Sequence, residues 1–263
     1  MDDNNGFGRR RIVSTLITVL EYFSINKCWI VKLFEMEKKH IVVLSGAGIS
    51  AESGLKTFRD SDGLWNGYDV YEVATPSGFK KNPSLVLEFY NDRRRDVAAA
   101  KPNAAHIELA NLENDFKVTI ITQNIDDLHE RAGSTNVVHL HGQIFKMRSV
   151  ADTNKIYEIK GDINVGDLAE DGYQLRPHIV WFEEDVPMME MAVKILRDAD
   201  YFVVVGTSLQ VYPAASLLQY APPFLPKFII DKKNPVTNNY PNLTVIEMSA
   251  TEGVKKLSTL LKS

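Results

Sequence analysis

The sequence predicts an α/β fold, a Rossmann-like doubly wound parallel sheet that carries a small inserted module. Short runs of β-branched residues alternate along the chain with segments of helical period, which is typical of such a sheet. Several of these runs end in a glycine-rich or polar loop. Ligands of doubly wound sheets bind at the carboxyl ends of the strands, so we expect a site among these loops.

The strands and helices follow from the same patterns. We expect strands at 41–45, 117–124, 136–142, 201–208, 227–231 and 243–248. We expect helices at 83–100, 104–114, 188–198, 214–219 and 251–261. Residues 143–178 are polar and show no strong period, so they predict a small module between the two halves of the sheet.

Composition narrows the function classes. The chain has 263 residues, enough for one large domain, and its net charge of −4 does not suggest a general nucleic-acid binder. It has one cysteine, Cys28, which cannot form an internal disulfide or a four-cysteine zinc site. A single cysteine fits a reducing compartment.

The first 35 residues differ from the rest of the chain. Three arginines at 9–11 precede an apolar run at 12–23, which Glu21 interrupts. A signal peptide lacks support because no small-x-small cleavage site follows. A membrane span lacks support because polar residues break the run well short of about 20 apolar residues. We expect residues 1–35 to be an N-terminal extension outside the fold, with a peripheral membrane helix as the alternative.

The first expected strand leads into Gly46-Ala47-Gly48-Ile49-Ser50-Ala51, which fits the G-x-G-x-x-A turn of dinucleotide-binding folds. Gly46 permits the tight turn, and Gly48 lets the backbone approach a pyrophosphate. The alternative is a plain strand-to-helix turn without a ligand. A hydride-transferring Rossmann domain shows a second strand ending in an acidic residue about 20 residues later, and residues 64–70 are loop-like instead.

Polar residues follow the next strands as well. Gln123, Asn124 and Asp126 offer donors and acceptors suited to a carboxamide or to ribose hydroxyls, or they cap a helix. His139 and His141 lie at the end of another strand, where a histidine can act as a general base near neutral pH.

A fourth motif, Gly206-Thr207-Ser208, predicts a phosphate- or ribose-binding turn, or a plain capped helix start. Together and in this order, the motifs resemble the sirtuin family of NAD-dependent protein deacylases. The resemblance covers residues 36–262 through "GAGIS", "TFR", "TQNID", "HG", "PHIVWFEE" and "GTS". It implies a catalytic domain at 36–263, with the small module at about 143–178.

The resemblance also implies residue roles. NAD would be consumed as a co-substrate, and His141 would be the general base. The backbone around Val180–Glu183 would pair with an extended substrate peptide. Two positions depart from the family pattern: many relatives have Asn at Asp231, and relatives usually have Gly at Glu183. The implied NAD-binding residues are Gly46, Ala47, Gly48, Ile49, Ser50, Phe58, Arg59, Trp65, Gln123, Asn124, Asp126, Gly206, Thr207, Ser208, Asp231 and Ala250.

Tyr90 and Arg93 lie three residues apart on a predicted helix, hence on one face. Bacterial class III sirtuins have Tyr-x-x-Arg here, which implies removal of succinyl or malonyl groups besides acetyl; the alternative is a solvated basic helix. The zinc-binding cysteines of most sirtuins are missing from 143–178, so we expect no zinc.

We therefore expect a cytoplasmic enzyme that releases nicotinamide and O-acyl-ADP-ribose from NAD and acylated-lysine proteins. We expect neither a nucleic-acid partner nor a membrane partner. A mono-ADP-ribosyltransferase and an NAD glycohydrolase are the alternatives on the same site, and a non-catalytic NAD sensor is the binding-module alternative.

Overall fold

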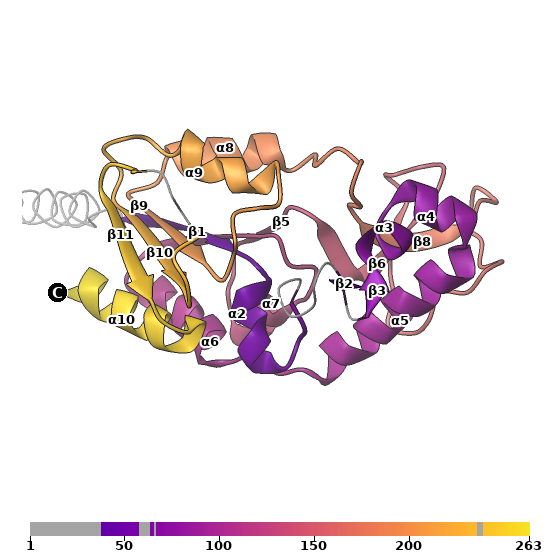
Figure 1. Ribbon diagram of the computed structural model, residues 1–263, viewed down its shortest axis with the longest axis horizontal. Coiled ribbons are helices and arrows are strands. Elements are labelled where there is room, and N and C mark those ends of the chain that lie inside the picture. The colour runs from indigo at the N-terminus through magenta and orange to yellow at the C-terminus, as the bar shows by residue number, and fades with distance from the viewer. Residues whose placement is uncertain (1–37, 58–63, 66, 236–238) are drawn as a thin grey trace, which may run out of the picture. The chain divides into compact units, whose positions relative to one another are not determined.

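The computed structural model describes residues 38–57, 64–65, 67–235 and 239–263 (Figure 1). The expected N-terminal extension lies outside these residues, and so do Phe58 and Arg59 of the predicted site. No helix in the described part of the chain is long and apolar enough to cross a membrane.

A six-stranded sheet has the order β11-β10-β9-β1-β4-β5, with every pair parallel. The strands are β1 (His40–Ser45), β4 (Lys117–Thr122), β5 (Val137–His139), β9 (Tyr201–Val205), β10 (Lys227–Asp231) and β11 (Leu243–Glu247). The predicted fold class is confirmed. The central strand β1 pairs with β4 on one side and β9 on the other, so the strand order reverses there. This is the switch point where such sheets bind ligands.

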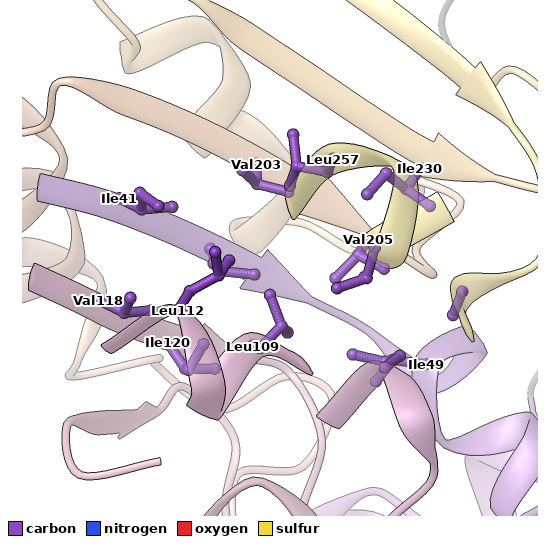
Figure 2. Close-up of a cluster of buried hydrophobic side chains, with 14 of the residues drawn as sticks. Ile41, Ile49, Leu109, Leu112, Val118, Ile120, Val203, Val205, Ile230 and Leu257 are labelled. Carbon is purple, nitrogen blue, oxygen red and sulfur yellow. The ribbon is translucent and has the colours of Figure 1, made fainter. Parts of the chain in front are cut away.

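Alternate residues of β1 face opposite cores. Ile41 and Val43 pack with α6 (Ala104–Asn111) and α10 (Ala250–Lys262), and Figure 2 shows Ile41 in this cluster. Val42 and Leu44 pack on the other face with α8 (Met189–Arg197) and α9 (Leu217–Tyr220). A strand buried on both faces requires the continuous apolar run that predicted it.

The chain between β1 and β4 contributes α2 (Ala47–Ser50), η1 (Ala51–Ser53), β2 (Leu64–Trp65), β3 (Tyr68–Asp69), α3 (Val70–Val73), α4 (Pro76–Lys81), α5 (Pro83–Ala99) and η2 (Leu112–Asn114). After β4 come α7 (Leu128–Ala132), β6 (Gly142–Ser149), β7 (Ile156–Glu158), β8 (Leu175–Ile179) and η3 (Ala214–Ser216). Strands β6, β7 and β8 form an antiparallel sheet in the order β7-β6-β8. Beside the six-stranded sheet, α3, α4, α5, β6 and β8 form a second part of the structure, whereas α2 and α7 lie against the sheet near α6 (Figure 1).

Side chains of α5 hold the polar segment between β7 and β8. The side-chain amide of Asn91 makes two hydrogen bonds to the backbone of Ile163, both at 3.0 Å: Nδ2 donates to the carbonyl, and Oδ1 accepts from the N–H. Arg94 is 1% exposed and donates to the carbonyls of Ile144 (2.9 Å) and Gly161 (3.1 Å) and to Asn91 Oδ1 (2.8 Å). Within the described residues, no group of three or more His, Cys, Asp and Glu could hold a metal ion. The hydrogen bonds of Asn91 and Arg94 to backbone attach this segment to the helix.

Replacing Arg94 tests this attachment. We expect Arg94→Met to reduce the free energy of unfolding by about 2–4 kcal/mol, because it leaves buried carbonyls without donors. At about 2–4 °C per kcal/mol, the Tm should fall by roughly 5–15 °C. Arg95 is the matched control: it is exposed and pairs with Asp92 and Asp162, so Arg95→Met should change stability by less than about 1 kcal/mol. Equal Tm losses in the two variants would contradict the attachment.

Candidate active site

A single cavity gathers most of the predicted site residues at the carboxyl ends of β1, β4 and β9. Its lining includes residues from the glycine turn, from the loops after β4, β5 and β9, and from α5. The predicted residues that line it are Gly46, Ala47, Ser50, Trp65, Tyr90, Arg93, Gln123, Asn124, Asp126, His141, Val180, Thr207 and Ser208.

The glycines of the turn are explained by contact between two loops. Gly48 N–H donates to the carbonyl of Gly206 at 2.7 Å, and a Cβ on Gly48 would lie 2.7 Å from that oxygen. Gly206 has φ +64, and a Cβ there would lie 2.3 Å from Ile49 N. Gly48 and Gly206 therefore let the loops after β1 and β9 touch, which brings both loops to one cavity.

A network of short side chains joins the loops after β1 and β4. Asn124 Nδ2 donates to Gly46 O (3.2 Å) and Ser50 Oγ (3.1 Å), and Ser50 Oγ donates to Asp126 Oδ2 (3.0 Å). Burial raises the pKa of Asp126, while hydrogen bonds from Leu128 N–H and Ser50 act in the opposite direction. The carboxylate is thus held in place at the cavity wall.

A buried histidine pair behind this network was missed by the sequence analysis. His106 Nδ1 accepts from Asn103 N–H (3.3 Å), so its Nε2–H is directed at Ser50 Oγ (3.5 Å). Its ring packs against His129 at 4.9 Å, and burial lowers the pKa of His106 to about 4. The Asn-x-x-His spacing at the start of α6 is the capping signal that could have found it.

The structure distinguishes the two predicted histidines. Both ring nitrogens of His139 are hydrogen-bonded, Nδ1 to Asn124 O (3.2 Å) and Nε2 to Glu130 Oε1 (2.7 Å), so neither is left for a substrate. His141 lies beyond the end of β5 and lines the cavity. Its Nδ1–H donates to Gln123 O at 3.0 Å, which leaves Nε2 as the proton acceptor. Burial lowers the pKa of His141, and the Gln123 carbonyl partly offsets this.

Another part of the cavity is aromatic and cationic. Tyr90 and Arg93 of α5 are buried there, and Tyr90 Oη and Arg93 Nε have no hydrogen-bond partner in the described residues. The guanidinium of Arg93 lies 5.5 Å from the Trp65 ring and 3.8 Å from Asp96. Trp181, which the sequence analysis did not single out, is also buried in this wall.

The segment after β8 borders the cavity and is tethered by its backbone. Val180 N–H donates to His141 O and Phe182 N–H donates to Ala74 O, both at 2.9 Å. Glu183 has φ +71, in the left-handed region that favours glycine. The departure at Glu183 therefore keeps the backbone course that a glycine adopts, and adds an exposed carboxylate at the cavity rim.

Some predicted residues lie outside the cavity lining. Gly48, Ile49 and Gly206 form the loop contact behind it. Asp231 ends β10 and accepts from Lys233 N–H at 3.2 Å, and Ala250 begins α10. Asp231 is thus on the strand next to β9 and Ala250 on the helix that contacts β10, and neither is in the wall.

Fold and cavity define an α/β protein with a ligand site at the switch point of a parallel sheet, and comparisons with known proteins identify the family. Residues 46–213 match the model of the Sir2 family, and the chain belongs to that family. It is 52% identical over 219 residues to a protein of Helicobacter pylori (strain ATCC 700392 / 26695) named NAD-dependent protein deacylase, covering 83% of this chain and 96% of the relative.

Two further matches agree. A Bacteroides thetaiotaomicron protein with the same name is 50% identical over 229 residues, covering 85% of this chain and 98% of the relative. The solved structure of a mutant Sir2 homologue in complex with ADP-ribose superposes with a TM-score of 0.77 at 38% identity, covering 86% of this chain and 93% of that one. The predicted family resemblance is confirmed.

The backbone at Glu183 leads to a stability prediction. A non-glycine residue in the left-handed region costs about 1–2 kcal/mol, whereas glycine adds about 0.4–1 kcal/mol of unfolded-state entropy. Glu183→Gly should therefore raise the unfolding free energy by up to about 1 kcal/mol in denaturant titration. Asp185→Gly is the control, because Asp185 is exposed on the same segment and has no positive φ, so glycine should lower stability there. A loss of stability in Glu183→Gly would contradict the strain at this position.

Proposed function

We propose that this chain is an NAD-dependent protein lysine deacylase that releases nicotinamide and O-acyl-ADP-ribose. The relatives' common name and the family membership support the activity. The observation that carries the proposal is one cavity that joins His141 and the Asn124–Asp126 loop to a buried Tyr90–Arg93 pair. Such a cavity offers one place for a nucleotide and another for an acyl-lysine.

The residues present fit NAD as co-substrate. The cavity is lined by polar residues from the loops after β1 and β4, namely Ser50, Gln123, Asn124 and Asp126. A short helix, Ala47–Ser50, begins at the glycine turn. NAD supplies an activated glycosidic bond, with nicotinamide as the leaving group. These side chains would hold ribose hydroxyls and the carboxamide, and Thr207 and Ser208 would line the adenosine side.

His141 is assigned as the general base. Its Nδ1–H is fixed on Gln123 O, so Nε2 is the basic atom that faces the cavity. Burial lowers its pKa, so the imidazole is neutral at pH 7 and can accept a proton from a ribose hydroxyl. Val180 lies next to it, where its backbone can pair with an extended substrate peptide.

Tyr90 and Arg93 are assigned to the acyl group. A dicarboxylic acyl chain, such as succinyl or malonyl, ends in a carboxylate that requires a partner when buried. Arg93 can provide a charge-assisted hydrogen bond and Tyr90 a neutral one. The proposal therefore includes desuccinylase and demalonylase activity beside deacetylase activity. A cytoplasmic location and acylated proteins as partners, without nucleic acid or membrane, complete the proposal.

Mass spectrometry of one reaction tests the activity. The purified protein is incubated with NAD and peptides that carry acetyl-, malonyl- or succinyl-lysine. Formation of O-acyl-ADP-ribose is expected from a deacylase. ADP-ribose without deacylated peptide would indicate a glycohydrolase, ADP-ribosylated protein a transferase, and intact NAD a binding protein.

Removal of His141 should stop turnover. We expect His141→Ala to lower kcat by about a hundredfold to ten-thousandfold, the usual contribution of a general base, while NAD binding measured by calorimetry changes little. In the wild type, kcat/KM should fall as pH drops through the pKa of His141, because protonation removes the base. Since that pKa is lowered, the acid limb should lie below the ordinary value of 6.5. A near-normal rate in His141→Ala would exclude it from the mechanism.

Removal of Arg93 should change acyl preference. Arg93→Met strands the substrate carboxylate, at a cost of about 2–4 kcal/mol, or about thirty- to a thousandfold in kcat/KM for succinyl-lysine peptide. Acetyl-lysine has no carboxylate and should lose much less. Tyr90→Phe should act in the same direction but more weakly. Equal losses on both peptides would mean that Arg93 supports the fold or the NAD site instead.

A further inference from the structure

Trp181 places a buried donor without an acceptor in the cavity wall. Its side chain is 3% exposed, and Nε1 has no hydrogen-bond partner in the described residues. Tyr90 Oη and Arg93 Nε are in the same condition, and all three residues line one cavity. Buried polar atoms of folded proteins are nearly always paired, so three such donors in the lining of one cavity are placed to meet the acceptor of a bound ligand.

The indole is held rigidly. The guanidinium of Arg176 lies 3.3 Å above its ring centre, and the rings of Phe79 and Tyr90 lie at 5.2 and 6.3 Å. Glu184 in turn fixes Arg176 at 2.6 and 3.1 Å and accepts from the Trp181 backbone N–H at 2.8 Å. A side chain stacked under a guanidinium, packed against two rings and held at its backbone loses little freedom when it donates to a ligand.

The indole N–H is close enough to the Tyr90 oxygen to favour the ionised form of the phenol, although the two atoms do not meet hydrogen-bond geometry. Burial raises the pKa of Tyr90, and the Trp181 N–H, followed by the charge of Arg176, acts in the opposite direction. Both groups therefore favour negative charge at the place where the Tyr90 oxygen lies. A ligand oxygen placed between the indole N–H and the Tyr90 hydroxyl would accept from both donors.

Arg93 is the cation beside Tyr90 and Trp181 that favours an anionic acceptor. Arg148 and Arg176 share the single carboxylate of Glu184. Arg93 has Asp96 at 3.8 Å, and that carboxylate is half exposed, which weakens its pairing. Arg148 and Arg176 lie outside the lining, which carries Lys56 and Arg93 against Asp126, Glu183 and Glu184. The attraction for a carboxylate is therefore local to Arg93 and does not come from an excess of positive charge.

We propose that the Trp181 indole N–H is a third donor to the terminal carboxylate of a dicarboxylic acyl-lysine, beside Tyr90 and Arg93. The inference rests on the proposed deacylase function and makes Trp181 a specificity-determining residue. A carboxylate has two oxygens and about four acceptor sites, so three donors can bind it together. Phenylalanine at this position would keep the ring and the stacking but lose the donor.

The test compares two four-carbon acyl groups, succinyl-lysine and butyryl-lysine, in the same peptide. They differ in whether the chain ends in a carboxylate or a methyl group. Trp181→Phe should lower the ratio of kcat/KM for succinyl over butyryl about tenfold, the effect of one hydrogen bond to a charged group. Tyr212→Phe is the matched control, since Tyr212 lines the same cavity and the change also removes one donor, and it should change the ratio less than threefold.

A double-mutant cycle with Tyr90→Phe sharpens the test. If both donors bind one carboxylate, their effects on the succinyl rate should be non-additive, whereas the butyryl rates should show no such coupling. Equal losses on both acyl groups in Trp181→Phe, with unchanged ratio, would overturn the inference and leave Trp181 as a packing residue. If the wild-type protein removes butyryl but not succinyl, the acyl assignment is overturned as well. If it is inactive on both peptides, the proposed function itself is overturned.

Discussion

The site depends on the contact between Gly48 and Gly206. Their backbones meet at 2.7 Å, a distance that a Cβ on either residue would prevent. The contact joins the loops that follow β1 and β9, and Asn124 then ties the loop after β4 to Gly46. Parallel strands alone bring loop ends to one edge, but only such close contacts hold their side chains at hydrogen-bonding distance. The absence of two side chains is thus what shapes the cavity.

From this contact the geometry extends to the cavity wall that contains Tyr90, Arg93 and Trp181. His141 is oriented by Gln123 O, and its own carbonyl accepts from Val180 N–H at 2.9 Å. The next residue is Trp181, whose backbone and side chain are both fixed through Glu184 and Arg176. The proposed base and the proposed carboxylate donor are therefore joined by one short stretch of hydrogen-bonded backbone. Displacing either residue would shift the other.

The sequence predicted the sheet well, because strands buried on both faces must be continuous apolar runs, as at 41–45 and 227–231. It did not predict β6, β7 and β8, since these short antiparallel strands carry polar residues without a clear period. The residue pattern alone did not separate His139 from His141, a choice that came only from the family resemblance, because the strand ends at His139 and the ring partners lie on α7 and in the loop after β4. Unpaired donors such as Trp181 Nε1 appear only when neighbours in space are known.

Helix α5 explains how the segment around Ile163 can be held by hydrogen bonds and still serve the site. Asn91 and Arg94, three residues apart, donate hydrogen bonds to backbone carbonyls of that segment and of β6. Tyr90 and Arg93 have the same spacing one position earlier and line the cavity on the neighbouring face. A rigid helix transmits position along its axis, so the hydrogen bonds that anchor the segment also set where Tyr90 and Arg93 lie. The stability of this attachment and the proposed acyl selectivity consequently depend on one helix.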